Sequence, residues 1–566
     1  MAVAEQCPMD ESRQLDPYEQ DKEAHESFMK SRSSSLLGRK DILEEIDRGS
    51  RGKCGALIVL GGPGIGKSSL LARAADVACL RAAKAMPSGQ GPNLNVFYHF
   101  VGAIPGSTNP EKMIKRLLRE LNVCNDLNMP KDYESACQIA SSALSNPNTR
   151  PTLIVIDALD QLDEDGTASA LRWLPSKLRW LPPELAPQVC CVLSMINETP
   201  PHHTLRERKI KRVELPVPPL EMESRREIVS EILGQFDKRL DEEQMVSLLS
   251  KEASQNPLWL SIACEELRVY GVFSKATDKI NTLADGLLEL LAQVLERLEA
   301  EGGGSLMVAT LCLLECSSSG LLEAELLAIL GDEDNLMPSD NGKNKKKKVK
   351  PVYKDCSRKT VTRKVVFIGS WSLEQVLLHL LCILKCSGAS KKRKKSNKPQ
   401  PLTAVKWARV YRTLQPFLRP FGESGEGRLE FYHRSLSKAV RKKYFNARLA
   451  GEGEGAAMNV TLVCWWNTKL ADYFENVSNL ERKVEEYPYQ LRKLGDKERL
   501  TECLSDWDMI KGLYNEDHSS QLLSYWRQMD EKYDTMASKY TEMSVAMSSD
   551  DPKKTADKLS CLARIL

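Results

Sequence analysis

Hydrophobic and polar residues follow one another along the first 217 positions in a pattern that predicts strands and helices in turn. Short, mostly apolar runs predict buried strands, and the segments between them carry helical spacing. The expected strands are Ala56–Leu60, Val96–Val101, Thr152–Asp157, Val189–Ser194 and Lys211–Val217. Strands that alternate with helices indicate a parallel sheet with helices on both faces. We therefore expect an α/β core with three layers.

After residue 217 the pattern becomes helical. Apolar residues at helical spacing predict helices over Glu221–Phe236, Glu242–Glu252, Pro257–Val269, Ala284–Leu298, Leu306–Leu314 and Ser372–Cys386. Val405–Phe417 and Glu430–Phe445 are expected to be structured, and a Gly/Glu link over 451–455 follows them. The last segment, Asn459–Leu566, has a helical pattern without a repeat of fixed period.

A glycine-rich turn joins the first expected strand to a helix. Gly61, Gly66, Lys67 and Ser68 match the P-loop pattern G-x-x-x-x-G-K-[ST] without a mismatch. Glycines let backbone N–H groups close around phosphate, Lys67 is expected to reach the β/γ-phosphates, and Ser68 is expected to ligate Mg²⁺. The alternative is a chance glycine turn. The predicted nucleotide site comprises Gly61, Gly62, Pro63, Gly64, Ile65, Gly66, Lys67, Ser68 and Ser69.

The third expected strand ends in an acid, Asp157, and Asp160 follows three residues later. An apolar strand that ends in Asp after a P-loop is the Walker B arrangement, in which the carboxylate holds Mg²⁺ through water. The alternative for Asp157 is a strand-end turn residue. Asp160 is expected to orient or deprotonate the attacking water, although this role stays open. Lys67, Asp157 and Asp160 are thus the candidate catalytic residues, and Ser68 and Asp157 the candidate metal ligands.

The overall charge does not indicate a nucleic-acid partner, because the net charge of the 566 residues is only +3. Two basic runs, 345–350 and 391–395, lie in low-complexity insertions. One interpretation is a solvated loop, and the other is a nuclear-import or nucleic-acid patch. No aromatic residues interleave the lysines, so we regard nucleic acid as the weaker alternative. The expected location is cytoplasmic, with a nuclear location as the alternative if the basic runs direct import.

Neither a signal peptide nor a membrane span is expected. The N-terminus is polar and acidic, and the longest apolar run, Val376–Leu384, is interrupted by His379 and is too short to span a bilayer.

Several motifs in this order resemble the STAND-class P-loop ATPases with a NACHT or NB-ARC type core. They are Leu37-Gly38-Arg39, the P-loop, Phe97–Gly102 with Ser107-Thr108, Leu153–Asp160, Asn256–Leu260 and His433. Within this class the chain is most similar to the nephrocystin-like, telomerase-associated and tetratricopeptide-repeat animal proteins. The tail motifs Leu470–Phe474, Glu486-Tyr487-Pro488, Asp506-Trp507 and Tyr525-Trp526 fit the helical segment that precedes repeats in those proteins.

This resemblance implies the domain organisation. It implies a polar leader (1–35), a P-loop NTPase domain (36–220), a helical domain (221–300), a winged-helix-like domain (301–450) and an α-helical segment (456–566). The lysine-rich insertions, 332–363 and 387–401, fall inside the winged-helix-like domain. Such proteins usually carry an N-terminal effector domain and C-terminal repeats, so the chain is expected to be either a truncated product or an unusually short member.

The resemblance also implies a nucleotide-dependent switch that ADP holds closed and ATP opens for assembly. By the same resemblance, Gly38 and Arg39 lie near the adenine, and Pro257 packs on it from the helical domain. His433 is expected to reach the β-phosphate from the winged helix. His433 also stands among Phe431, Tyr432 and Leu436, so a core histidine is the alternative.

Two departures from the family pattern bear on turnover. Ser194–Asn197 offers no arginine at the phosphate-sensor position after the fourth strand, and Gln161 replaces a second acid after Asp160. The first hypothesis is therefore a switch that hydrolyses ATP slowly, with protein partners and homo-oligomers formed on ATP binding. The second is an interaction scaffold with structural nucleotide. A kinase-like phosphotransferase is a weaker third.

Overall fold

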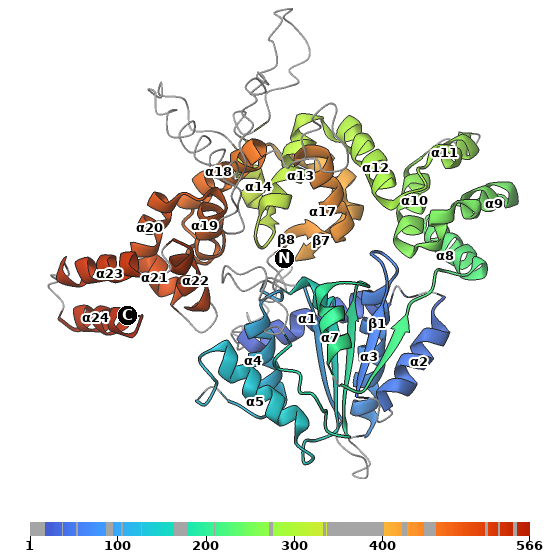
Figure 1. The fold of residues 1–566 in the computed structure, drawn as a ribbon. Coiled ribbons are helices and arrows are strands. Elements are labelled where there is room, and N and C mark those ends of the chain that lie inside the picture. Colours follow the sequence, from blue (N-terminus) through green and yellow to red (C-terminus); the bar gives the residue numbers. More distant parts are fainter. Residues whose placement is uncertain are drawn as a thin grey trace, which may run out of the picture. The chain divides into compact units, whose positions relative to one another are not determined.

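The computed structural model describes most of the chain. The described residues are 17–34, 36, 38–51, 55–85, 94–103, 106–125, 127–162, 178–208, 210–270, 275–331, 336, 401–421, 427–445, 460–514, 519–529, 533–546 and 552–565. They divide into two compact units (Figure 1). The first unit holds the described residues from 17 to 162 and from 178 to 228, together with 421 and 427, and the second holds the others. The division falls within helix α8 (Met222–Gly234).

The first unit is built on a parallel sheet of five strands with the order β2-β3-β4-β1-β5. The strands are β1 (Ala56–Leu60), β2 (Asn95–Phe100), β3 (Thr152–Asp157), β4 (Val189–Met195) and β5 (Arg212–Pro216). Each lies within one or two residues of the expected strand. The α/β P-loop core with a parallel sheet is therefore confirmed.

Helices cover both faces of this sheet because alternate residues of each strand point to opposite sides. One face packs against α1 (Pro17–Ser33), α2 (Lys40–Arg51) and α3 (Lys67–Ala85), with Leu57 and Val59 in its core. The other face packs against α4 (Pro110–Glu120), α5 (Tyr133–Ser145) and α7 (Pro200–Glu207), with Ala56, Ile58 and Leu60 in its core. The layers are visible in Figure 1 as the dark-blue and cyan helices on either side of the arrows.

The expectation of a polar leader over residues 1–35 is wrong for its second half, because residues 17–33 form helix α1. Its inward side carries Met29, which is 2% exposed, and His25, which is 1% exposed. The Nδ1 atom of His25 accepts a hydrogen bond from the Phe100 backbone N–H at 3.3 Å. A histidine that is neutral and hydrogen-bonded can occupy a core position, although its residue type counts as polar in a sequence pattern.

Helices dominate the second unit up to residue 445, as expected. They are α9 (Glu242–Ser250), α10 (Pro257–Val269), α11 (Ala276–Thr282), α12 (Leu287–Gly302), α13 (Ser305–Cys316), α14 (Glu323–Leu330), α16 (Ala404–Leu414) and α17 (Arg434–Val440). Short helical turns are η2 (Glu252–Gln255), η5 (Gln415–Phe417) and the π-type η6 (Arg441–Phe445). The expected helix Ser372–Cys386 lies outside the described residues, as do the lysine-rich insertions apart from residues 336 and 401.

A three-stranded sheet accompanies these helices. It consists of β6 (Leu321–Leu322), β8 (Arg428–Phe431) and β7 (Leu418–Phe421) in that order, with β6 antiparallel to β8. Among the described residues, helices α14 and α16 come between β6 and β7 in the chain. The winged-helix assignment of residues 301–450 stays a prediction.

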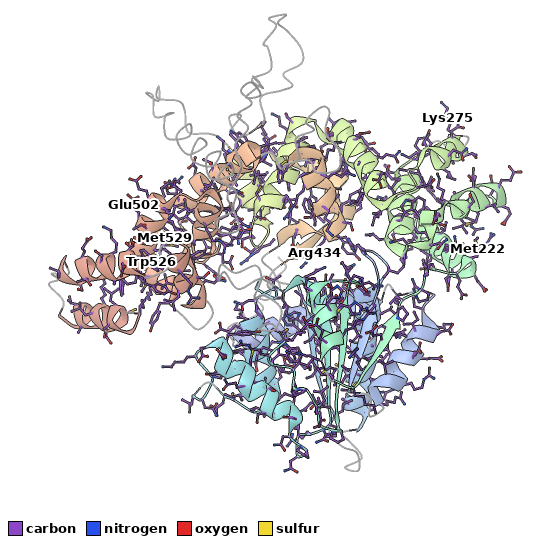
Figure 2. All side chains as sticks on the ribbon, in the orientation of Figure 1. Met222, Lys275, Arg434, Glu502, Trp526 and Met529 are labelled. Carbon is purple, nitrogen blue, oxygen red and sulfur yellow. The ribbon has the colours of Figure 1, made fainter. Side chains whose placement is uncertain are left out.

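The C-terminal segment is helical throughout its described part, as the sequence predicts. Its helices are α18 (Val460–Glu475), α19 (Leu480–Leu494), α20 (Lys497–Ser505), α21 (Trp507–Leu513), α22 (Ser519–Met529), α23 (Asp534–Ala546) and α24 (Pro552–Ile565). Trp526, labelled in Figure 2, is fully buried, and its indole N–H donates to the Tyr540 hydroxyl at 3.0 Å. Trp526 thus stabilises the packing of α22 against α23.

Candidate functional site

The glycine-rich turn between β1 and α3 has the backbone that the P-loop pattern predicts. Gly64 and Gly66 have φ values of 76° and 98°, which side chains with a Cβ rarely adopt. A Cβ on Gly61 would come within 2.8 Å of the Ile65 side chain, whereas a Cβ on Gly62 would meet nothing within 4 Å. Gly61 is therefore needed for packing inside the protein, and Gly62 leaves open space at the surface of the loop.

Lys67 is the first residue of α3, and its ammonium group folds back over the loop. The Nζ atom donates to the carbonyl oxygens of Gly61 at 2.6 Å and Gly62 at 2.9 Å. Burial lowers the pKa of Lys67, while the negative charges of Asp157 and Asp160 act in the opposite direction. The cation thus lies in the field of both candidate acids.

Asp157 ends β3 at the edge of the sheet where the P-loop follows β1. It is 3% exposed, and its Oδ1 atom accepts a hydrogen bond from the Ser194 hydroxyl. Ser194 belongs to β4, which lies between β1 and β3. The order of strands therefore brings the Walker B acid and the P-loop to the same carboxyl edge, which is where open parallel sheets bind ligands.

Asp160 lies on the short helix η1 (Leu159–Gln161), immediately after a turn at Ala158 with φ 55°. Its Oδ1 atom accepts a hydrogen bond from the Ile196 backbone N–H at 3.3 Å. Burial raises the pKa of Asp160, and Lys67 counteracts this shift. A carboxyl group whose pKa is raised toward neutrality is better suited to move a proton than an ordinary surface carboxylate.

Arg39 connects two backbone segments beside the P-loop. The guanidinium donates to the carbonyl of Pro218 at 2.6 Å and to that of Ile65 at 3.3 Å, and the residue is 7% exposed. Burial lowers the pKa of Arg39. Gly38, with φ 64°, packs so closely on α8 that a Cβ would lie 2.5 Å from the Ser224 side chain. Arg39 thus contacts the P-loop and Gly38 contacts α8, and the contact of both residues with adenine stays a prediction.

The comparison with known families agrees with this geometry. Residues 56–235, which include the P-loop, Asp157, Asp160 and Ser194, match the model of the NACHT domain. The chain contains a NACHT domain. A NACHT domain is a P-loop NTPase, and this assignment implies nucleotide binding.

Three relatives show which proteins this chain is similar to. It is 22% identical to a TPR repeat-containing protein from Dictyostelium discoideum over 70% of this chain and 19% of that protein. It is 27% identical to telomerase protein component 1 from Rattus norvegicus over 48% of this chain and 10% of that protein. It is 27% identical to nephrocystin-3 from Homo sapiens over 25% of this chain and 10% of that protein. These are the kinds of relative that the sequence motifs indicate, and the chain spans no more than a fifth of their length.

Two predicted site residues, Pro257 and His433, belong to the second unit and not to the unit that holds the NACHT P-loop. Pro257 is the first residue of α10, whose N-terminus is capped by the Asn256 side chain. His433 caps α17, where its Nδ1 atom accepts a hydrogen bond from the Ser435 N–H at 3.1 Å. Capping is a local role that the sequence did not predict, and the contacts of both residues with nucleotide stay predictions.

The donor set at the NACHT P-loop fits Mg²⁺. This ion prefers oxygen ligands, and Ser68 supplies a hydroxyl and Asp157 a carboxylate. Among the described residues, no hydrogen bond engages the Ser68 hydroxyl or the Oδ2 atom of Asp157. These two oxygens would therefore hold the ion or its water ligands, and the ion would neutralise phosphate charge there.

Ser194 is a component of this site that the sequence did not predict. The segment after the fourth strand was expected only to lack an arginine. The available signal was a single polar residue near the end of an otherwise apolar strand, next to the Walker B strand in the expected sheet. Such a hydroxyl must find a buried partner, and the nearest strand end supplies one.

Within the described part of the chain, no helix is long and apolar enough to cross a membrane. The same residues contain no cluster of three or more His, Cys, Asp or Glu side chains that could hold a metal ion without help from a ligand.

Proposed function

We propose that this chain is an ATP/ADP-binding switch that hydrolyses ATP slowly and uses the exchange of nucleotide to rearrange its domains or to assemble with partners. The observation that carries this proposal is the convergence of Lys67, Asp157 and Asp160 at one edge of the sheet, inside a NACHT domain. A switch of this kind works through a difference in the affinities of ATP and ADP for two domain arrangements. We further propose protein partners, because the chain resembles a protein whose name includes TPR repeats, and we propose a cytoplasmic location.

The alternative is a scaffold in which the nucleotide is structural and turnover is absent. Gln161, which occupies the position after Asp160, favours this alternative, because an amide cannot act as a base at that position. The two functions share nucleotide binding and differ in hydrolysis and in the response to ATP.

The first test is to identify the bound nucleotide. The purified chain is denatured, and the released nucleotide is quantified by ion-exchange chromatography. We expect close to one ADP per chain, and little or none with Lys67→Ala, because that variant removes the phosphate-binding ammonium. Wild-type protein that neither carries nucleotide nor takes up added ADP would contradict both the switch and the nucleotide-bearing scaffold.

The second test separates the switch from the scaffold. Asp160→Asn should bind ATP but reduce turnover by about 100-fold or more, in the range expected for loss of a general base. It should also shift the chain toward oligomers when ATP is added, as measured by light scattering after size exclusion. Asp76→Asn is the matched control, because Asp76 pairs with Arg73 on the surface of α3. If wild type shows no turnover and Asp160→Asn changes nothing, the scaffold is supported instead.

A further inference from the structure

We propose that Ser194 is a positioning residue that orients the Asp157 carboxylate toward Mg²⁺, and that it thereby sets how strongly the ion strengthens nucleotide binding. This inference rests on the proposed nucleotide binding and adds a residue to it.

The hydroxyl of Ser194 has both of its hydrogen-bonding directions fixed by the protein. It is 0% exposed and accepts a hydrogen bond from the Ala158 backbone N–H at 2.8 Å. Its single proton is therefore directed to the remaining partner, the Oδ1 atom of Asp157. Because the hydroxyl is buried and has partners on both sides, it holds one orientation.

This contact fixes the orientation of the Asp157 carboxylate. With Oδ1 held by the hydroxyl, rotation of the carboxylate would break a buried hydrogen bond. The second oxygen, Oδ2, is then the atom presented to a cation, and no described residue donates to it. Ligands that are oriented by a neighbouring hydrogen bond bind metal more tightly than ligands that must be ordered on binding.

The chemical nature of the partner also matters. An arginine beside Asp157 would compete with Mg²⁺ for the negative charge of the carboxylate. A serine hydroxyl is neutral, so it orients the carboxylate and leaves the charge to the ion. Lys67 is a cation whose charge interacts with both acids.

Ser194 also stabilises the turn that leads to the second acid. Ala158 adopts φ 55°, a left-handed conformation that is unfavourable for alanine. Its N–H donates to the Ser194 hydroxyl, and the backbone N–H of Ile196, the residue that follows β4, donates to Asp160. The end of β4 thus holds both candidate acids by hydrogen bonds.

The experiment measures ADP binding by calorimetry in the presence of EDTA and in the presence of Mg²⁺. Wild-type full-length chain should bind ADP more tightly with Mg²⁺. Ser194→Ala should lose about 10-fold of that gain, the loss typical of removing a residue that orients a metal ligand. Its affinity in EDTA should change by less than about 2-fold, because the P-loop contacts to phosphate are intact. Ser194→Thr retains the hydroxyl and should restore most of the gain.

The matched control is Thr152→Val. Thr152 is 1% exposed at the opposite end of β3, and its hydroxyl donates to the Arg150 carbonyl at 2.8 Å. Loss of a buried hydroxyl there should leave the magnesium gain unchanged. If Ser194→Ala retains the full increase in ADP affinity with Mg²⁺, or if wild type shows no such increase, the proposed role of Ser194 is overturned. Nucleotide binding itself is not contradicted by either result. A wild type that binds no ADP overturns both.

Discussion

At the scale of single residues, a buried charged side chain near the P-loop joins two backbone segments by hydrogen bonds. Arg39 is the main example, because its guanidinium bonds the carbonyls of Ile65 and Pro218 at the same time. A guanidinium presents several donors in a fixed plane, whereas an ammonium is a single point donor. The link between the P-loop and the segment after β5 therefore requires arginine specifically.

We expect Arg39→Lys to lower the free energy of unfolding by about 1–2 kcal/mol, because the lysine can reach only one of the two carbonyls. ADP affinity should fall as well, since Ile65 lies in the P-loop. Thermal unfolding and calorimetric titration with ADP measure the two effects. Arg73→Lys is the control, because Arg73 makes an exposed ion pair with Asp76 that contributes little. If Arg39→Lys and Arg73→Lys have the same thermal stability and the same ADP affinity, Arg39 does not join the two backbone segments in the way proposed.

At the scale of elements, the sequence predicts the sheet well and the outer helices less well. The strands were predicted because each is a short apolar run, and a strand buried on both faces needs such a run. The helix α5 was not predicted, because its buried side combines the small residues Ala136, Cys137 and Ala140 with the single large residue Leu144. Small residues give a weak amphipathic signal even when they pack closely.

The candidate site likewise contains features that the sequence predicted and contacts that it did not. The P-loop and Asp157 were predicted because their motif has fixed spacing. The contact between Ser194 and Asp157 joins residues 37 positions apart, and only the order of strands brings them together. The interaction of His25 with Phe100 spans 75 positions and was missed for the same reason.

Helix α1 is anchored to the sheet by a pair of buried histidines. The rings of His25 on α1 and His99 on β2 lie 4.5 Å apart, and the Nε2 atom of His99 donates to the Ser107 carbonyl at 2.7 Å. Burial, and secondarily the charge of Arg116, lowers the pKa of His99 to about 3 and that of His25 well below 6.5. Both histidines are therefore neutral in the folded protein at neutral pH.

This anchor predicts a loss of stability in acid. Because the folded-state pKa values are lowered, the unfolded chain binds more protons below pH 6.5, and stability falls as the pH falls toward 3. Between pH 6 and pH 5 the loss should be about 1 kcal/mol for each histidine. His25→Gln keeps a hydrogen-bond acceptor for Phe100 but does not titrate, so its unfolding midpoint should depend less on pH than that of wild type. Thermal unfolding at the two pH values measures this difference.

The control is His203→Gln, because the His203 side chain is 50% exposed. It should show the pH dependence of wild type. If His25→Gln and wild type lose stability equally between pH 6 and pH 5, His25 does not contribute to the acid sensitivity.

At the scale of the whole molecule, a switch needs stiff connections that carry movement along the chain. One such connection, within the second unit, joins α19 to the segment between α13 and α14. Arg482, 2% exposed, donates to both carboxylate oxygens of Glu325, at 2.8 and 2.9 Å, and to the Ser319 hydroxyl at 2.8 Å. Glu486, 0% exposed, accepts from the backbone N–H groups of Ser318 and Ser319, both at 2.9 Å. The C-terminal helices are thus fixed to the 305–331 region by buried charges.

Arg482→Met tests this connection. Removing the only arginine that bonds Glu325 among the described residues leaves buried carboxylates without their counter-charge, which typically costs about 3–5 kcal/mol. Burial raises the pKa of Glu486, and Arg482 acts against this shift, so the variant should favour the protonated acid. Hydrogen exchange should increase in residues 313–331 and in α19, while ADP binding by the NACHT domain should be unchanged if the damage stays within this connection.

The cause of the loss can be separated from a mere packing defect. If uncompensated charge is responsible, Arg482→Met combined with Glu325→Gln and Glu486→Gln should recover part of the stability, because the added amides remove the buried charges. Arg499→Met on α20 is the matched control, since the Arg499 side chain is 24% exposed and pairs with Asp472 and Glu475, which are about half exposed. It should leave hydrogen exchange in residues 313–331 unchanged. A triple variant no more stable than Arg482→Met would show that packing, and not charge compensation, holds the C-terminal helices in place.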